Sequence, residues 1–381
     1  MLKLLILSRY DRRGASSRLR SLQYVPYFEA AGLEVTVASF FDGAYLDGVY
    51  GGRAAGLDML RYFARRLRQL CVHRADVVLL EKEMLPWVPA FIECALLPRG
   101  IPLVVDYDDA VFHRYDAHRS PLVRAVLGDK IDRVMRYANV VLAGNPYLAA
   151  RARKAGARQV ELVPTVVDTE HYGTTRRPCT DGRLRIGWIG TPETWLGFGN
   201  AYAGLLGEVV AAHKAVVRAV GAGPAETAPK NFEFLPWSEA SEVELIQGMD
   251  IGIMPLAETP WARGKCGYKL IQYMACGVPV VASPVGVNVD IVTEGTHGFL
   301  ARDDAEWRKA LATLLSDGAL RARMGAAGRA RVEAHYALQV YGPKVAALLA
   351  GLAAQGGQHR GALRRPALSR AHKSSSAGKE A

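Results

Sequence analysis

Residues 260–286 read Pro-Trp-Ala-Arg-Gly-Lys-Cys-Gly-Tyr-Lys-Leu-Ile-Gln-Tyr-Met-Ala-Cys-Gly-Val-Pro-Val-Val-Ala-Ser-Pro-Val-Gly, and this stretch decides the fold that the sequence predicts. It predicts a loop with two glycines, a helix over residues 268–276, a tight turn at Gly277 and a buried strand over residues 278–282. A helix that leads through a turn into a continuously apolar strand is typical of a parallel sheet covered by helices. The stretch therefore predicts an α/β domain.

The loop before this helix has the features of an anion site. Gly264 and Gly267 let the backbone approach a ligand where the helix begins, and there N–H groups and the helix dipole favour a diphosphate. The candidate contacts that follow from this position are Arg263, Lys265, Gly267, Tyr268, Lys269 and Gln272. An ordinary surface loop explains the lysines but not the glycines, the proline and the buried strand together. We therefore predict a diphosphate-binding pocket over residues 263–272.

Short, continuous apolar runs recur along the whole chain of 381 residues. The candidate strands are Leu4–Leu7, Glu34–Ala38, Val77–Leu80, Leu103–Val105, Val140–Leu142, Leu184–Ile189, Ala215–Val220, Phe232–Leu235, Ile251–Met254 and Val278–Ala282. Helix-length amphipathic segments lie between most of them, and repeated strand–helix–strand order implies parallel sheets with right-handed crossovers. Because the chain is too long for one hydrophobic core, we expect two domains.

The strand–helix pattern restarts after a polar stretch at residues 171–183, and this places the domain boundaries. We predict a first Rossmann-like domain over residues 1–170 and a second over residues 171–335. A cross-over helix is expected over residues 336–355, followed by a disordered basic tail over residues 356–381. That tail has six Arg or Lys residues and one Glu, so +5 of the net charge of +11 lies in it. The remaining charge is too small to indicate a nucleic-acid-binding protein.

Cysteine spacing and hydropathy indicate the cellular compartment in which the protein is expected. The five cysteines are scattered, without the spacing of a zinc site or a disulfide framework. No apolar run reaches the roughly 18–20 residues that cross a bilayer. The apolar start at residues 1–8 is too short for a signal peptide, and we interpret it as the first strand. These features predict a cytoplasmic protein without a zinc site, and no cofactor is expected beside the substrates.

In open parallel sheets, ligands bind beyond the carboxyl ends of the strands, so the residues there are candidates for the site. After the first strand, Gly14 permits close backbone approach, and Arg18 in the following helix offers a bidentate phosphate contact. The alternative is an ordinary strand–helix turn with Ser16 or Ser17 as N-cap. The chain has neither a Gly-x-Gly-x-x-Gly nor a Gly-Lys-Ser/Thr sequence, which argues against a dehydrogenase and a P-loop enzyme.

Three carboxylates follow another strand, at Asp106, Asp108 and Asp109. Clustered like charges raise each other's pKa values unless they share a cation, so this arrangement indicates a functional site. The carboxylates are candidates for hydrogen bonds to ligand hydroxyls, for a catalytic base or, through the Asp-x-Asp spacing, for a metal–diphosphate contact. The alternative is helix capping in a solvated turn. For the nearby Glu81, Glu83 and His113, surface salt bridges are expected.

Two strand ends in the second half complete the candidate site. Gly190 and Thr191 follow the first strand of that half and offer backbone N–H groups and a hydroxyl to a phosphate. Trp237 follows Leu235-Pro at another strand end and offers a ring on which a nucleotide base can stack. The alternatives are an ordinary turn for Gly190 and Thr191 and a tryptophan at the edge of the core.

The chain resembles glycosyltransferase family 4 over most of its length, to about residue 350. The resemblance is carried by Val163-Pro-Thr-Val-Val-Asp168, Ile186-Gly-Trp-Ile-Gly190, the stretch from Gln272 to Ser283, and Gly298-Phe-Leu300. It implies the GT-B fold, in which two Rossmann-like domains face each other across a cleft, with a C-terminal helix that returns to the first domain. It also implies transfer from a nucleotide-diphosphate sugar, with retention of configuration and without a metal.

The sequence departs from the family pattern at the glutamates expected near the donor. Gly264 occupies the position of the first family glutamate. Gln272 occupies the position of the second, and its amide can still form hydrogen bonds with the hydroxyls of a ribose. The Arg and Lys that the resemblance places after Gly190 are also missing, so Arg263, Lys265 and Lys269 are expected to carry the phosphate charge. The chain is similar to a subgroup of this family that shares the Lys-Cys-Gly-Tyr-Lys segment. Asp108 falls near the family's first-domain His, and we expect Asp108 and Asp109 to be catalytic.

The expected function is therefore transfer of a sugar to a glycan or lipid-linked hydroxyl in the synthesis of envelope polysaccharide or glycolipid. The alternative is a non-catalytic nucleotide-sugar-binding or scaffold protein, suggested by the missing glutamates. A basic amphipathic helix over residues 57–74, with Leu60, Phe63, Leu67 and Leu70 in one stripe, suits peripheral contact with anionic lipid at the inner face of the plasma membrane. The alternative for this helix is packing on its own sheet, with its arginines in water.

Overall fold

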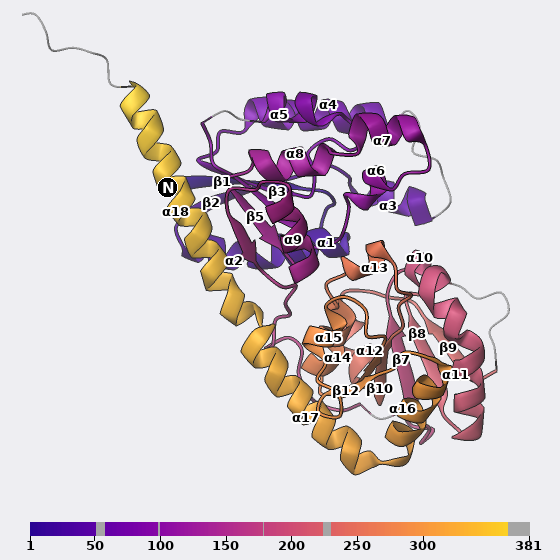
Figure 1. Ribbon diagram of the computed structural model, residues 1–381. Coiled ribbons are helices and arrows are strands. Elements are labelled where there is room, and N and C mark those ends of the chain that lie inside the picture. Colours follow the sequence, from indigo (N-terminus) through magenta and orange to yellow (C-terminus); the bar gives the residue numbers. More distant parts are fainter. Residues whose placement is uncertain (51–57, 98–99, 178, 224–229, 365–381) are drawn as a thin grey trace, which may run out of the picture.

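The computed structural model of the chain describes residues 1–50, 58–97, 100–177, 179–223 and 230–364. These residues form two domains, each built on a six-stranded parallel sheet with helices on both faces (Figure 1). The first sheet has the order β2-β1-β3-β4-β5-β6. Its strands are β1 (Leu2–Ser8), β2 (Leu33–Ser39), β3 (Val77–Glu81), β4 (Leu103–Tyr107), β5 (Val140–Ala143) and β6 (Val160–Leu162). The helices of this domain are α1 (Ala15–Arg20), η1 (Leu22–Tyr24), α2 (Val25–Ala30), α3 (Gly43–Tyr50), α4 (Asp58–Val72), α5 (Ala90–Leu96), α6 (His113–Asp116), α7 (Pro121–Leu127), α8 (Lys130–Tyr137) and α9 (Pro146–Lys154).

The second sheet has the order β12-β11-β10-β7-β8-β9. Its strands are β7 (Arg185–Ile189), β8 (Val216–Val220), β9 (Phe232–Leu235), β10 (Ile251–Met254), β11 (Val280–Ala282) and β12 (Gly298–Leu300). The helices that follow β7 are α10 (Pro192–Thr194), η2 (Trp195–Gly199), α11 (Asn200–Ala212), α12 (Glu242–Gln247), α13 (Pro260–Arg263), α14 (Tyr268–Ala275), α15 (Asn288–Ile291), α16 (Asp304–Ser316), α17 (Gly318–His335) and α18 (Leu338–Arg364).

All ten predicted strands are confirmed as β1–β5 and β7–β11. Their continuous apolar character has a simple cause, since strands such as β3 and β4 are buried along their whole length between two helical layers. The sequence missed β6 and β12, which are three residues long and lie at sheet edges. An edge strand of this length is only partly covered, so it lacks the apolar run that identified the others.

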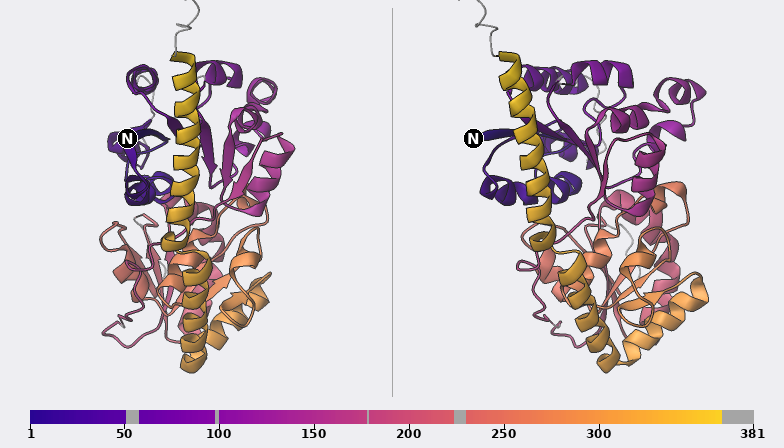
Figure 2. Two further views of the ribbon diagram at one scale, coloured as in Figure 1. Left: turned by 90° about the vertical axis from the view of Figure 1, so that its left-hand side faces the viewer. Right: turned by 60° about the vertical axis from the view of Figure 1, so that its left-hand side comes forward.

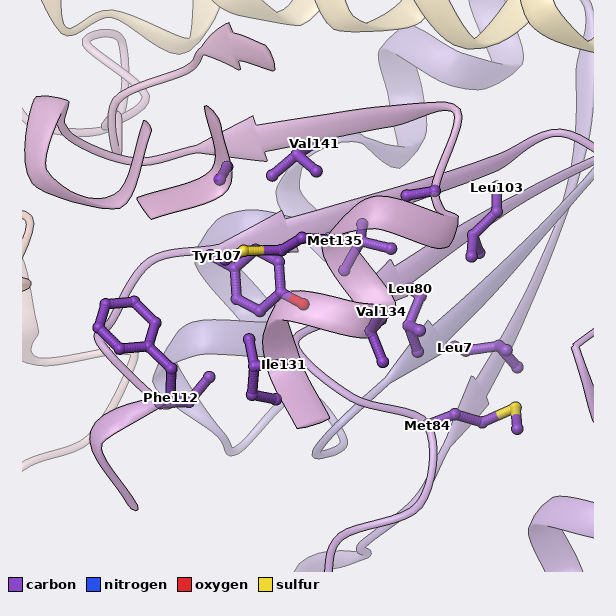
Figure 3. Packing of buried hydrophobic residues seen from close by; sticks show 14 of the residues in the cluster. Leu7, Leu80, Met84, Leu103, Tyr107, Phe112, Ile131, Val134, Met135 and Val141 are labelled. Atoms are coloured by element: carbon purple, nitrogen blue, oxygen red, sulfur yellow. The ribbon is translucent and has the colours of Figure 1, made fainter. Parts of the chain in front are cut away.

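Two apolar clusters cover the two faces of the first sheet. On one face, helices α4, α7, α8 and α9 pack over β3, β4 and β5. Figure 3 shows part of this packing, with Tyr107 next to Met135, Phe112 at one side, and Ile131 and Val134 projecting from α8. The opposite face is covered by residues of α2 and α18. Burial on both faces stabilises the parallel sheet, because its strands have no polar side to turn toward water.

The long helix α18 returns to the first domain, as the sequence predicted. Its residues Val345, Leu349 and Ala353 are buried together with residues of β1, η1 and α2. The two views in Figure 2 show it running along the first domain. The helix continues through residues 356–364, which we had assigned to the disordered tail, so this assignment was wrong for them. Residues 365–381, the rest of that tail, lie outside the described residues.

The strand orders place the functional edges of both sheets. In the first sheet the chain leaves β1 in opposite directions for β2 and β3, and in the second it leaves β7 in opposite directions for β8 and β10. Ligands of open parallel sheets bind at such switch points, beyond the carboxyl ends of the strands. In this protein, residues that follow strands of both sheets line one cavity.

Candidate functional site

A cavity of about 870 Å³ lies between the two domains. Residues after β1 and β4 line it from the first domain, and residues after β7, β8 and β9 line it from the second. Eleven of the predicted site residues contribute to its wall, namely Arg18, Asp108, Asp109, Gly190, Thr191, Trp237, Lys265, Gly267, Tyr268, Lys269 and Gln272. The cavity is large enough for a nucleotide and a sugar.

Two predicted contacts, Gly14 and Arg263, do not line the cavity. Gly14 precedes α1 and packs against Tyr10, where a Cβ atom on Gly14 would lie 2.2 Å from the Tyr10 Cβ atom. Arg263 is exposed at the end of α13 and forms an ion pair with Glu258. The pairing is local, within one surface turn, and the sequence pattern could not distinguish it from a contact with an anion.

Lys265 and Lys269 bring two ammonium groups to the second-domain wall of the cavity. They flank Gly267, whose φ of +65° is the left-handed conformation that glycine adopts without strain. A side chain on Gly267 would also meet Ile291, with its Cβ atom 2.2 Å from the Ile291 Cδ1 atom. The helix α14 begins immediately afterwards, so its positive end lies beside the two lysines.

Lys269 is the more unusual of the two cations. Its Nζ atom lies 5.3 Å from the centroid of the Trp188 ring, and in the described part of the chain no carboxylate forms an ion pair with it. Burial, together with the nearby charge of Lys265, lowers the pKa of Lys269 to about 7. A cation held this way is costly unless an anion enters the cavity beside it.

The three aspartates after β4 have three different environments. Asp106 is buried and forms a bidentate ion pair with Arg20, at 2.9 Å to Nε and 2.5 Å to Nη2. Asp108 pairs with the ammonium of Lys82 at 2.8 Å and accepts a hydrogen bond from the Ser16 hydroxyl at 2.7 Å. The two carboxylates of the Asp-x-Asp pattern therefore each have a side-chain cation as partner, which argues against the metal–diphosphate interpretation of that spacing.

Asp109 differs from Asp108, the other aspartate of the cavity wall, because its environment holds its pKa above the usual value. Burial raises the pKa, and the charges of Lys265 and Lys82 only partly offset the effect. For Asp108, burial also acts to raise the pKa, but the charges of Lys82 and Arg20 and the hydrogen bonds from Lys82 and Ser16 together outweigh it, and the pKa lies below its usual value. Both carboxylates line the cavity, so the site contains one firmly ionised acid and one adjusted toward proton exchange.

Lys82 was missed by the sequence analysis. It directly follows β3, is buried, and has a left-handed backbone with φ of 63°, which is uncommon for a residue with a side chain. Its ammonium contacts both Asp108 and the Ser16 hydroxyl, the latter at 2.9 Å. Strained backbone of this kind is concentrated at functional sites.

The prediction of surface salt bridges was wrong for Glu81 and Glu83, which are fully buried. Glu81 accepts hydrogen bonds from the Ser17 hydroxyl and the Arg9 backbone N–H. Glu83 pairs with Lys130 at 2.6 Å and with Arg9 at 2.9 Å. His113 does pair with an acid, Asp116, at 2.8 Å. The sequence Glu-Lys-Glu at residues 81–83 has the composition of a solvated turn. Its burial was not predictable because the groups that pair with these side chains come from distant segments of the chain.

The second-domain side of the cavity contains a hydrogen-bonded network around Glu242. This residue of α12 accepts hydrogen bonds from the indole N–H of Trp237 at 2.6 Å and from the Tyr172 hydroxyl. Gln272 donates to the same tyrosine hydroxyl at 3.0 Å. Arg18 crosses from the first domain, with its guanidinium 4.9 Å from the centroid of the Trp237 ring and 3.9 Å from Glu242. Nothing in the sequence singles out Glu242, since its segment has the pattern of an ordinary amphipathic helix.

Within the described ranges, no group of three or more His, Cys, Asp or Glu residues is arranged to hold a metal ion. No helix in the same ranges is long and apolar enough to cross a membrane.

Comparison with known proteins places these features in a family context. Residues 195–317 match the family model described as "Glycosyl transferases group 1". The GDP-mannose-dependent monoacylated alpha-(1-6)-phosphatidylinositol monomannoside mannosyltransferase of Corynebacterium glutamicum is 37% identical over 84 residues, which are 22% of this chain and 22% of that protein. The D-inositol 3-phosphate glycosyltransferase of Stackebrandtia nassauensis is 40% identical over 62 residues, 16% of this chain and 14% of the relative. The matched segments thus span less than a quarter of the length of either relative.

Solved structures are similar over almost the whole chain. HepE of Anabaena, in complex with UDP and glucose, covers 92% of this chain and is itself covered completely, with a TM-score of 0.64 and 17% identity. The sucrose-phosphate synthase of Thermosynechococcus elongatus has a TM-score of 0.64 at 15% identity, over 95% of this chain and 99% of that one. WaaG, a glycosyltransferase involved in lipopolysaccharide biosynthesis, has a TM-score of 0.64 at 13% identity, over 91% of this chain and 99% of that one. These likenesses show the GT-B fold.

Proposed function

We propose that this protein is a glycosyltransferase that moves a sugar from a nucleotide-diphosphate sugar to a hydroxyl of a glycan or lipid-linked acceptor. The observation that carries the proposal is the position of Lys269, a desolvated cation in the wall of the interdomain cavity beside Lys265 and the start of α14. A diphosphate is the ligand that two ammonium groups and a helix N-terminus accommodate together. The resemblance to glycosyltransferase family 4 and the family match over residues 195–317 support the same chemistry.

The reaction that we propose uses each wall of the cavity for a different task. Lys265, Lys269 and the N–H groups at the start of α14 neutralise the diphosphate as its bond to the sugar breaks. Stabilisation of developing charge by fixed groups is usually the largest catalytic contribution. Asp109 lies in the first-domain wall near Lys265 and contacts the sugar or the acceptor hydroxyl, and Lys82 and Ser16 hold Asp108 beside it. We further propose that the enzyme retains the anomeric configuration and needs no metal.

The nucleoside is assigned to the other end of the cavity. Trp237 and Arg18 offer flat surfaces to the base, and Gln272 and Glu242 offer an amide and a carboxylate to the ribose hydroxyls. In this arrangement Glu242 supplies the carboxylate that the family places at position 272. Support comes from the network that joins these residues through Tyr172.

Titration calorimetry with UDP-, GDP- and ADP-sugars tests the donor assignment. We expect one nucleotide series to bind with a dissociation constant of about 1 μM to 1 mM, the usual range for enzyme substrates. Slow hydrolysis of the preferred donor to free sugar and nucleoside diphosphate should accompany binding. If a donor binds but neither hydrolysis nor transfer to acceptor extracts is detected, the scaffold alternative is correct. If no donor of the three series binds, both proposals fail.

An apolar and basic face of the first domain suits a lipid-linked acceptor, and we propose that it contacts an anionic membrane from the cytoplasmic side. Helices α4, α5 and α7 lie together on the side away from the second domain (Figure 1). Large apolar side chains are exposed on each of them, at Leu60, Leu67, Val72, Phe91, Ile92, Leu96, Leu122 and Val126. On α4 the exposed residues include Arg61 and Arg68. This combination of apolar and cationic groups favours adsorption to anionic lipid.

The structure corrects one detail of the predicted amphipathic helix. Phe63 and Leu70 turn toward the core, whereas Leu60 and Leu67, from the same predicted stripe, are exposed. Arg66, expected in water, is buried and donates hydrogen bonds to the carbonyls of Ala38 at 2.8 Å and Ser8 at 2.7 Å. Only part of the basic charge on α4 therefore faces outward.

The double variant Phe91→Ser/Leu122→Ser is expected to bind vesicles of anionic phospholipid about tenfold more weakly than the wild type at low salt. The reason is that each side chain, 67% and 72% exposed, contributes apolar area that a membrane would bury. Co-sedimentation measures the effect. Val289→Ser removes an exposed apolar side chain from the second domain and serves as the matched control. Equal binding of all three proteins, or no binding by the wild type, would contradict a membrane role for this face.

A further inference from the structure

Asn145, at the carboxyl end of β5, lies outside the cavity wall but contacts the loop that holds Lys265. The side chain is buried, and its amide nitrogen donates to the backbone carbonyl of Gly264 at 2.8 Å and to that of Lys265 at 3.1 Å. Its amide oxygen accepts a hydrogen bond from the N–H of Leu148 at 2.9 Å and so caps α9. One side chain therefore fixes a helix in the first domain and a loop of the second.

Close packing surrounds these hydrogen bonds. Cys266 extends from the same loop into the apolar core of the first domain, where its thiol donates to the carbonyl of Asp108 at 3.1 Å. A Cβ atom on Gly144 would lie 2.4 Å from the Cys266 sulfur. A Cβ atom on Gly264 would lie 2.4 Å from the Cβ atom of Ala110. The two domains thus meet at this loop with no room for a further methyl group.

We propose that Asn145 is a positioning residue that clasps the Gly264–Gly267 loop against the first domain and thereby couples domain closure to diphosphate binding. The coupling part of this proposal rests on the proposed function. A diphosphate bound by Lys265 and Lys269 stabilises the same loop conformation that Asn145 holds from the other side. Two interactions that favour one conformation strengthen each other reciprocally.

Two variants loosen the clasp from opposite sides. Asn145→Asp keeps the oxygen that caps α9 but loses the amide donor, and it places a carboxylate against two carbonyls. Gly264→Ala suits the local backbone, since φ is −79° and ψ is −8° at this residue, and the three atoms nearest to its methyl group all belong to Ala110 of the first domain. The matched control is Asn139→Asp before β5, because the oxygen that accepts from Leu103 N–H is retained there.

The rate at which iodoacetamide alkylates Cys266, measured by peptide mass spectrometry, reports opening of the interface. Burial raises the pKa of Cys266 to about 12, so the thiol reacts only when the loop leaves the first domain. Exposed Cys71 provides the internal reference rate. Without ligand, we expect both clasp variants to react about tenfold faster at Cys266 than the wild type and the Asn139→Asp control. UDP should protect Cys266 in the wild type and bind Asn145→Asp about tenfold more weakly.

The outcomes separate the clasp from the proposed function. Unchanged Cys266 alkylation in both folded variants, checked by circular dichroism, would overturn the clasp whether or not UDP binds. Faster alkylation with unchanged UDP affinity would overturn the coupling and leave only an interdomain contact. If UDP does not bind the wild type, GDP and ADP are tested in its place. If none of the three binds, the proposed donor fails, and the ligand-free rates still decide the clasp. If Asn145→Asp does not fold, Gly264→Ala carries the same test.

Discussion

Replacing Lys269 by methionine is expected to weaken the binding of UDP or another nucleoside diphosphate at least about hundredfold and to make the unliganded protein more stable. The loss follows because a charged partner is removed from a desolvated anion site, where such groups contribute about 2–5 kcal/mol. The gain, about 1 kcal/mol, follows because the ammonium is unfavourable in its surroundings before an anion arrives. Calorimetry and thermal unfolding measure the two effects. A variant that loses both binding and stability would contradict the assignment.

The pH dependence gives a second measurement for the same residue. With a pKa of about 7, Lys269 is charged below pH 7 and loses its charge as the pH rises through that value. A bound anion raises this pKa, so binding at pH 8 should take up a proton and its enthalpy should vary with the buffer. Between about pH 7 and the unfolded value of 10.5, the unfolded chain holds more protons at this group, so the apo protein gains stability with pH. Both effects should be absent in Lys269→Met.

Replacing Asp109 by asparagine is expected to lower the transfer rate at least about hundredfold while the donor binds equally well or more tightly. The rate falls because Asp109 is the cavity carboxylate whose environment favours proton exchange, and a positioned acid or base contributes about 10²–10⁴-fold. Donor binding does not fall because a negative charge beside Lys265 has been removed. Steady-state kinetics with separate kcat and KM, together with calorimetry, distinguish the two. Wild-type turnover by Asp109→Asn would remove Asp109 from the mechanism.

Asp108→Asn is the comparison that separates catalysis from architecture. Its carboxylate pairs with buried Lys82, so the substitution leaves an ammonium without its partner. We expect a loss of about 3 kcal/mol in the free energy of unfolding, in the range found when one member of a buried pair is removed. Asp109→Asn should be neutral or slightly stabilising, since burial disfavours its carboxylate.

The fold was predictable because the central strands, such as β3 and β4, are buried on both faces and therefore largely apolar, and because the strand–helix pattern repeats along the chain. The pocket segment was predictable for a related reason, since glycines and lysines at a helix start determine local backbone and local charge. Partners of buried charges were not predictable. Lys82 meets Asp108 and Arg20 meets Asp106 only after β3, β4 and α1 have packed, so nothing in the local sequence marks them.

The same limit explains the residues at the second-domain end of the cavity. Glu242 and Tyr172 are far apart in sequence, and their shared network with Gln272 forms only when α12 and α14 pack together. For Arg263, the predicted partner is an anion in the site, whereas the structure pairs its guanidinium with Glu258, five residues away. The sequence shows which element carries a charged residue, but tertiary packing determines which group its side chain contacts.

The path of α18 bears on how the protein is made. A ribosome releases the chain from its N-terminus, yet residues 338–353 supply part of the apolar layer under β1, η1 and α2. The first half of the polypeptide therefore emerges long before the residues that cover its sheet have been synthesised. The second domain, residues 185–335, is complete earlier than the first, so the order of maturation is reversed relative to the order of translation. A chain that stops before Leu338 would leave part of that sheet face open to chaperones and proteases.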